Sequence, residues 1–443
     1  DLDVDGTTNL DVVDIDGAVD MASTLNVSGA ITSGAITSSG VVTANDHIDL
    51  NNDGNRGKIG FNSNNVFIAS TSSSGEIIFK NNVSSGNPPQ TGGDTLLTLA
   101  DGGNATFAGT INGVGIKAGV SNFATSILIS SDGSTGTLSS ASSNTGLGDS
   151  VFAALTSGTN NTAIGNAAMA ANTTGSLNTA IGNGAFDTNT TGSSNVAVGD
   201  RALTANTTAD DNTAVGSLAL TANTTGTNNT ALGKSALATN TTGSQNVSVG
   251  TFSLDANTTA SANTSVGYAS LTSNTTGTQN VALGTSALFN NTTASNNTAV
   301  GYQGLKGNTT GNDNVSVGTN SLFANTTGND NTALGMSALN ANTTADNNVA
   351  VGYHALLSNT TGSENTAVGS LALDANSTGA NNVAMGHGAL SGNTTASNNT
   401  AIGMFGLLSN TTGANNVAVG TNALNDNTTA SNNTSIGKSS SAA

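Results

Sequence analysis

The chain has 443 residues, of which 8% are charged and 3% aromatic, with no Trp and no Cys. Much of its 35% hydrophobic fraction is Ala, which excludes a thick core of large side chains, and the lack of Cys excludes disulfides and thiolate metal sites. The net charge of −18 disfavours binding to nucleic acid or to anionic membranes.

The sequence contains no run near the roughly 18 apolar residues of a membrane span. It begins with Asp1, without a charged and then apolar leader. We therefore expect no membrane insertion, and we interpret the chain as a fragment or a processed product.

The first third of the chain predicts β structure in three parts. Residues 1–45 contain short alternating runs punctuated by Gly, such as LDVDG and LNVSGAIT, which predict an acidic shaft of short strands. Residues 46–125 contain longer strand candidates, among them KIGF, VFIAS, EIIFK and LLTLA, and predict a small β module. Residues 126–143, rich in Ser, Gly and Thr, are interpreted as a connector.

The rest of the chain is one repeat. The motif N-[TV]-[AS]-[VILM]-G begins at Asn161 and recurs at a step of 17 residues through Asn433, after a looser copy at Asn144. This gives 17 full units over residues 144–432 and a partial unit to 437, followed by a tail at 438–443. A fixed interval without insertions is typical of stacked structural repeats.

A unit reads N-[TV]-A-[VIL]-G-x-x-A-L-x-x-N-T-T-[GA]-x-x. Its apolar positions fall in two clusters, at two and four and at eight and nine, which predict two short strands per unit. The recurrent Gly and Asn-Thr-Thr argue against a helix. We therefore predict an all-β, fibrous β-solenoid in which each unit is one coil; at about 4.8 Å per coil, 17 coils would span roughly 80 Å.

Asn at position twelve is followed by Thr or Ser and then Thr in sixteen units, so each is formally an N-glycosylation sequon. We interpret these residues instead as a structural ladder of stacked side-chain amides. The ladder comprises Asn172, Asn189, Asn206, Asn223, Asn240, Asn257, Asn274, Asn291, Asn308, Asn325, Asn342, Asn359, Asn376, Asn393, Asn410 and Asn427.

Gly occupies position five of every unit, which indicates a turn with positive φ or a close backbone approach. These structural glycines include Gly165, Gly182, Gly199, Gly216, Gly233 and Gly250. Leu at position nine is expected to be the largest regular core residue.

Position six is the most variable column and includes Tyr268, Tyr302 and Tyr353. Variation beside an invariant Gly indicates exposure. The tyrosines are candidates for contact with host sugars or a partner, since exposed aromatic rings stack on such surfaces; the alternative is a tolerant surface position.

No pattern in the sequence indicates catalysis, a cofactor or a strong metal site. DLDVDG at Asp1 and DLNNDG at Asp49 resemble the first half of a calcium loop but lack the Glu at the twelfth position. We interpret them as polar turns, with a weak calcium site as the alternative. His354 and His387 lie two coils apart, too far to share a metal within one chain.

The Asn-x-Ala-Val/Ile-Gly core with downstream Ala-Leu resembles the repeats of the YadA-like head of trimeric autotransporter adhesins, over residues 144–437. Similar arrays occur in bacteriophage tail fibres, and the phrase TLADGGNATFAGTI resembles the shafts of such fibres. The resemblance implies a left-handed parallel β-roll with three chains side by side. The repeat of the family is shorter, so the Asn-Thr-Thr-Gly segment is expected to be an enlarged turn.

Together these observations predict a non-enzymatic structural and adhesive fibre. The resemblance implies an extracellular homotrimer in a virion tail fibre. Its expected partners are other tail proteins and a host receptor, with a glycan as the candidate receptor. A bacterial trimeric surface adhesin is the main alternative. An ice-binding solenoid is a remote one, because adjacent threonines of a strand point to opposite faces, and a carbohydrate-active enzyme on a solenoid would need a pair of acids.

Overall fold

The computed structural model describes residues 122–130 and 135–441 in full, and before them the backbone of eight strands between 47 and 118. All regular elements of these residues are strands, and none of them forms a helix that could cross a membrane. Contacts divide the chain into two units, Asp1–Thr106 and Phe107–Ala443. The expected shaft at 1–45 lies outside the described residues.

The first unit contains two small sheets. The strands β1 (His47–Asn52), β2 (Asn55–Asn62) and β3 (Asn65–Ser70) form an antiparallel meander. A second sheet joins β4 (Ile77–Lys80), β5 (Thr95–Leu99) and β6 (Ala105–Phe107). Asp49 of the calcium-loop candidate thus lies within a hairpin strand, opposite Lys58.

The solenoid begins earlier than the repeat. The hairpin of β7 (Thr110–Ile111) and β8 (Val114–Ala118) pairs antiparallel with β10 (Ile127–Ser130), and β10 then pairs in parallel with the first repeat strand. Two further strands, β9 (Phe123–Ala124) and β11 (Ala141–Ser142), pair with each other. Of the stretch 126–143 that the sequence interprets as a connector, residues 127–130 and 141–142 therefore lie in paired strands.

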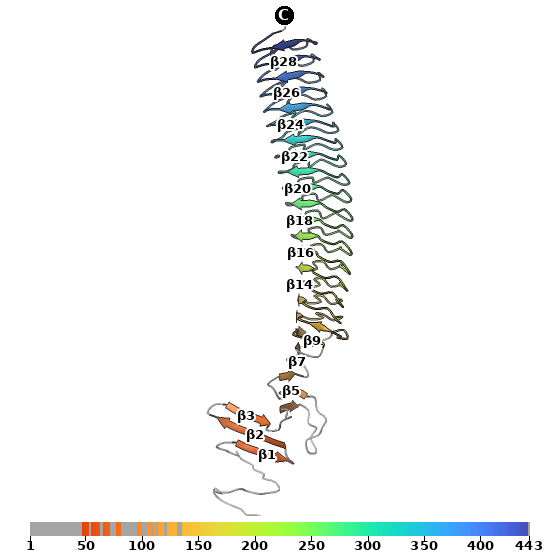
Figure 1. Ribbon diagram of the computed structural model, residues 1–443, viewed down its shortest axis with the longest axis vertical. Coiled ribbons are helices and arrows are strands. Elements are labelled where there is room, and N and C mark those ends of the chain that lie inside the picture. The colour runs from red at the N-terminus through yellow and green to blue at the C-terminus, as the bar shows by residue number, and fades with distance from the viewer. Residues whose placement is uncertain are drawn as a thin grey trace, which may run out of the picture. The chain divides into compact units, whose positions relative to one another are not determined.

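Eighteen parallel strands follow, one per coil, and we number the coils from coil 1 at Asn144 (Figure 1). Each strand covers positions two to four and pairs in register with the same positions of the next coil, as Thr213 pairs with Thr230. The all-β parallel solenoid is thus confirmed. The strands are β12 (Thr145–Leu147), β13 (Thr162–Ile164), β14 (Thr179–Ile181), β15 (Val196–Val198), β16 (Thr213–Val215), β17 (Thr230–Leu232), β18 (Val247–Val249), β19 (Thr264–Val266), β20 (Val281–Leu283), β21 (Thr298–Val300), β22 (Val315–Val317), β23 (Thr332–Leu334), β24 (Val349–Val351), β25 (Thr366–Val368), β26 (Val383–Met385), β27 (Thr400–Ile402), β28 (Val417–Val419) and β29 (Thr434–Ile436).

The prediction of two strands per unit is wrong. Positions seven, nine and seventeen have left-handed φ in every full coil, for example 54° at Ser235, 53° at Leu237 and 60° at Gln245. None of these columns holds a β-branched residue, because branching at Cβ makes this conformation costly. The second apolar cluster therefore forms a stacked turn, and its core residue is Leu rather than Val or Ile.

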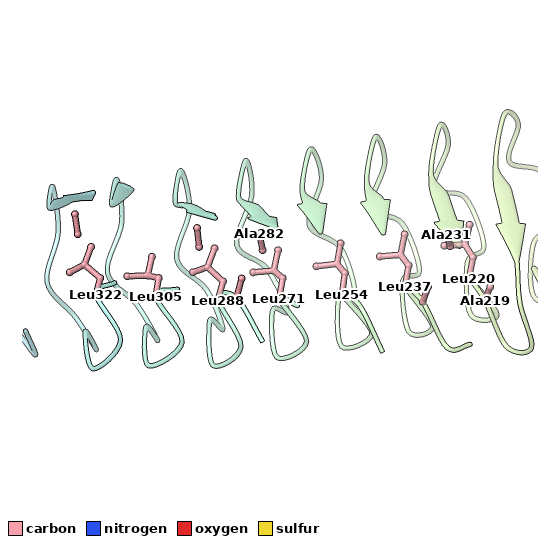
Figure 2. Packing of buried hydrophobic residues seen from close by; sticks show 14 of the residues in the cluster. Ala219, Leu220, Ala231, Leu237, Leu254, Leu271, Ala282, Leu288, Leu305 and Leu322 are labelled. Carbon is pink, nitrogen blue, oxygen red and sulfur yellow. The ribbon is translucent and has the colours of Figure 1, made fainter. Parts of the chain in front are cut away.

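The core is thin and repeats at every coil. Ala at positions three and eight and Leu at nine are buried, and the leucines of successive coils lie directly over one another (Figure 2). Coils 1 and 3 hold the larger Phe152 and Phe186 at position nine. Each coil thus packs chiefly on its two neighbours.

Gly at position five has φ between 129° and 143°. A Cβ added to Gly233 would lie 2.6 Å from the carbonyl carbon and oxygen of Gly250 in the next coil. Both a positive φ and a close approach therefore require Gly here. The bend at this Gly ends each strand after three residues.

Candidate functional site

Position-twelve asparagines form a continuous column inside the rod. Asn189 donates through Nδ2 to Oδ1 of Asn172 at 2.7 Å, and also to the carbonyl of Gly192 in its own coil at 3.0 Å. The same two bonds recur along the column to Asn427. The Asn side chain of each of the sixteen sequons thus hydrogen-bonds along the rod. From Asn172 to Asn410 these side chains are fully buried.

A second column, at position one, escaped the sequence interpretation. Oδ1 of Asn161 accepts a hydrogen bond from the backbone N–H of Asn178 at 3.0 Å. Nδ2 of Asn178 donates to the carbonyl of Gly192 at 2.9 Å. The invariance of Asn at position one was the available signal.

The two columns converge on one acceptor. The carbonyl of Gly192 accepts from both Asn178 and Asn189, and the same arrangement recurs at Ala209 and Gly226. In these coils the carbonyl at position fifteen therefore links the start of the coil to the bend after position nine. Buried amides that are fully hydrogen-bonded in this way fix the position of each coil on the next, because the rest of the core is small and apolar.

Two adjacent hydroxyl residues, Thr or Ser and then Thr, follow each position-twelve Asn, and they differ in role. Thr173 donates through its hydroxyl to the carbonyl of Thr190 in the next coil at 2.8 Å, whereas Thr174 is exposed. The Asn-Thr-Thr edge thus exposes a single Thr column. An ice-binding face needs two such columns on one flat surface, which this edge does not supply.

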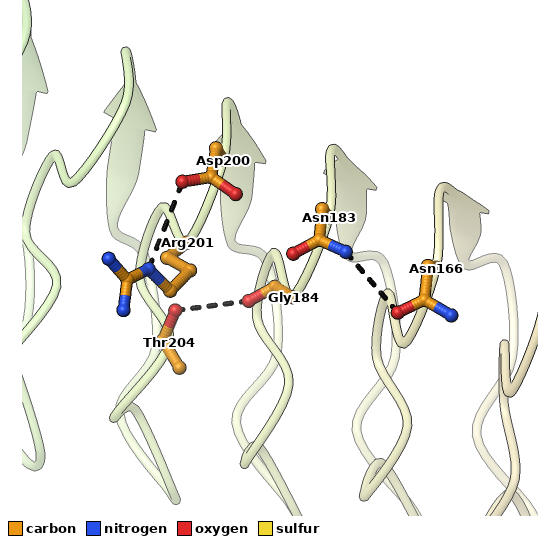
Figure 3. Close-up of polar contacts among 6 residues, drawn as sticks. All are labelled: Asn166, Asn183, Gly184, Asp200, Arg201 and Thr204. Atoms are coloured by element: carbon orange, nitrogen blue, oxygen red, sulfur yellow. Dashed lines mark hydrogen bonds and ion pairs between the residues drawn. The ribbon is translucent and has the colours of Figure 1, made fainter.

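The position-six column lies at the corner after the invariant Gly. Figure 3 shows its polar start, where Asn183 donates to Asn166 one coil away at 3.2 Å and Asp200 lies 3.8 Å from Arg201. Thr204 donates to the carbonyl of Gly184 beneath them at 3.0 Å. Asn166 and Asn183 therefore link side chains of adjacent coils here, and Thr204 links its side chain to the backbone of the preceding coil.

Farther along, the same corner becomes aromatic. Tyr268, Tyr302 and Tyr353 are about half exposed, at 56%, 51% and 46%. Tyr268 contacts Phe252 edge to face at 6.3 Å, and Tyr353 stacks on His354 at 3.7 Å. We call the corner column from Phe252 to Phe405 the aromatic corner; it also includes Met336, His387 and Met404.

Two further side-chain clusters lie elsewhere on the coils. Lys306 lies between Phe289 and Phe323 at position ten, 6.0 Å and 5.6 Å from their ring centroids. In the core, Ser replaces Ala at positions three and eight together, as in Ser316 and Ser321, whose hydroxyls hydrogen-bond each other. Both clusters link neighbouring residues of the stack.

The titratable side chains of the rod include Asp187 and His387. Burial raises the pKa of the Asp187 carboxyl above its ordinary value. His387 contacts Phe405 edge to face at 5.1 Å, and the described residues contain no group of three His, Cys, Asp or Glu side chains placed to hold a metal. Comparison with protein-family models, curated proteins and solved structures found no match.

Proposed function

We propose that this chain is a structural and adhesive component of a homotrimeric fibre, of the kind found in virion tail fibres. The observation that carries the proposal is the uninterrupted stack of eighteen in-register coils. Such a stack can be lengthened by adding coils, since each coil is a template for the next. The side chains on its surface are held at fixed distances along one axis. The rod thus serves as a spacer that presents its surface to a host cell.

Self-association is the first part of the proposal to test. The net charge of −18 would keep copies apart at random orientations, so a trimer requires a defined uncharged surface. Light scattering of the full chain at native pH is expected to return a mass three times that of one chain. A monomer over the whole concentration range would contradict the trimeric fibre.

The aromatic corner is the part of the rod that we propose contacts the host surface. Tyr268 and Tyr302 are separated by two coils, about 10 Å at the usual strand spacing, and both rings are half exposed. Aromatic faces at such intervals stack on the apolar faces of sugar rings. The proposed receptor is therefore a surface glycan that runs along the rod.

The test is adsorption of the labelled full chain to a panel of bacterial cells and to arrays of their surface polysaccharides. Replacing Tyr268, Tyr302 and Tyr353 together by Ser, which stands at position six in Ser217 and Ser370, is expected to reduce binding at least about tenfold. Replacing the exposed Thr276, Thr310 and Thr361 by Ala is the matched control. Unchanged adsorption of the Tyr variant would remove the aromatic corner from the proposal.

A further inference from the structure

The outer face of the strands is uncharged along the whole stack, with Thr or Val beside an apolar residue in every coil. Side chains at positions two and four point away from the core, since position three is buried between them. Position two is Thr or Val and position four is Val, Ile, Leu or Met, and no coil places a charge at either. We call this surface the strand face; the rest of the coil surface carries the Asp, Glu, Lys and Arg residues of the rod.

Nine coils carry a side chain larger than Val at position four, and six of these nine follow a period of three coils; the other three are Leu147, Ile164 and Ile402. The six are Ile181, Leu232, Leu283, Leu334, Met385 and Ile436, each 51 residues after the last, and all are 37–72% exposed. From coil 4 onward, the two coils between successive members of this series carry Val at position four, except for Ile402. A protruding side chain therefore rises from the strand face about every 14 Å, since coils are spaced about 4.8 Å apart.

The size of the strand face fits association between copies. Eighteen strands of three residues have a flat outline of about 850 Å² per copy, which is comparable with the roughly 800 Å² that one partner contributes to a stable interface. In a trimer each copy would share this outline between its two neighbours. A second copy is the occupant that shares the 51-residue period. Since each copy is acidic, the uncharged strand face is also where two copies approach with least repulsion.

A uniform repeat alone would leave the axial register of such an assembly undefined. If every coil carried Val at position four, copies displaced by one coil would lose only the contacts at the two ends. With a larger side chain at every third coil, displacement by one or two coils sets each Leu against Val and leaves voids where the leucines had met. The period thus penalises two of every three possible displacements.

We infer that copies of this chain associate in parallel through the strand face, at equal heights, and that the three-coil period of large side chains at position four fixes this register. Equal height follows from the closed rotational symmetry that most homo-oligomers adopt, which places identical residues around the axis. The inference rests on the proposed self-association and adds the surface and the register.

Because the chain has no Cys, single-cysteine variants test the surface directly. Val300→Cys lies on the strand face of coil 10, and Thr310→Cys lies on the exposed threonine column of the same coil. With a short bis-maleimide, the full chain carrying Val300→Cys is expected to cross-link to itself at least tenfold more than the Thr310→Cys control. A trimer mass without this cross-link would overturn the strand face but not the fibre.

Mixed assemblies of Val300→Cys and Val317→Cys, one of them tagged, test the height. Cross-links between identical positions are expected to exceed those between the two neighbouring coils. The opposite order would show copies displaced by one coil and would overturn the equal-height register.

Moving the large side chains tests the period itself. The combined exchanges Leu232→Val with Val249→Leu, Leu283→Val with Val300→Leu, and Leu334→Val with Val351→Leu shift three of them by one coil at constant composition. This variant is expected to assemble normally with itself, since its copies still match, but to form mixed trimers with the wild-type chain about tenfold below the statistical fraction. Statistical mixing, or failure of the folded variant to self-assemble, would overturn the inference.

Discussion

Single glycines and asparagines decide whether neighbouring coils can stack. A Cβ added at position five would clash with the backbone of the next coil. At position eight, as in Gly406, there is room for a Cβ. At positions one and twelve a buried amide serves the coils on both sides. The stability of this rod therefore depends on a few columns in which Gly or Asn cannot be replaced by another residue without loss of a contact between coils.

Gly403 and Gly406 provide a matched pair three residues apart. Gly403 has φ of 129°, and its Cβ would lie 2.6 Å from the carbonyl carbon of Gly420, whereas the Cβ of Gly406 would meet no atom closer than 3.5 Å. Gly403→Ala is expected to destabilise the rod by at least about 2 kcal/mol, measured by thermal unfolding. Gly406→Ala should be neutral or stabilise by about 0.5–1 kcal/mol, and equal effects would contradict the close approach.

Asn291 tests the position-twelve column. Its side chain donates to Asn274 at 2.9 Å and to the carbonyl of Ala294 at 3.0 Å, and accepts from Asn308 at 2.9 Å. Asn291→Ala strands a buried donor and acceptor and is expected to cost about 2–4 kcal/mol in denaturant unfolding. Asn296→Ala, at an exposed position of the same coil where Ala262 stands elsewhere, is the control and should cost at most about 1 kcal/mol, because its φ of 61° is left-handed.

Asp187 gives stability a pH dependence of defined sign. Its pKa is raised in the folded chain above the ordinary 3.8 by burial, so ionisation favours the unfolded chain. The destabilisation is absent below the ordinary pKa and grows as pH rises through the folded pKa. Asp187→Asn is therefore expected to raise Tm at pH 7 and to leave it unchanged near about pH 3; a lowered Tm at pH 7 would contradict the burial.

The coil is the element of this fold, and only its first half is a strand. Thr, Val and Ile at positions two and four favour extended backbone, which the three-residue strands display. The second half turns through left-handed residues at seven and nine. The sequence signal for this turn was the complete lack of β-branched residues at positions seven and nine. The prediction of a strand considered only the apolar residues at positions eight and nine.

Pairs of buried serines show how two positions of a coil act together. Ser316 donates to the backbone carbonyl of Ser321 at 2.9 Å, and Ser321 donates to that of Gly318 at 3.1 Å. Replacing both by Ala gives the composition of most other coils and is expected to change stability by less than about 1 kcal/mol. A double-mutant cycle measures the coupling; a large loss in the double variant would show that the pair is required.

The whole rod behaves as a sum of coils whose only strict requirement is the 17-residue step. Deletion of coil 9, residues 280–296, is expected to preserve strand content and cooperative melting, and to shorten the rod by about 4.8 Å in small-angle scattering. Deleting residues 280–287 instead leaves half a coil and breaks both amide columns, so melting should broaden and begin earlier. Equal behaviour of the two deletions would contradict the stacked-coil architecture.

The sequence by itself determined the repeat, its step, the parallel solenoid, the thin core and the invariant Gly, because each is a periodic pattern of size, polarity and backbone freedom. Only the tertiary structure decided that β10 (Ile127–Ser130) pairs with the first repeat strand, that the second apolar cluster is a turn, and that Asn at positions one and twelve share one carbonyl. These features depend on contacts with the next coil and on residues with left-handed φ. Local patterns of apolar residues do not encode either of them directly. The strand face joins the two levels: its three-coil period is written in the sequence, but only the fold places those side chains on one outer surface.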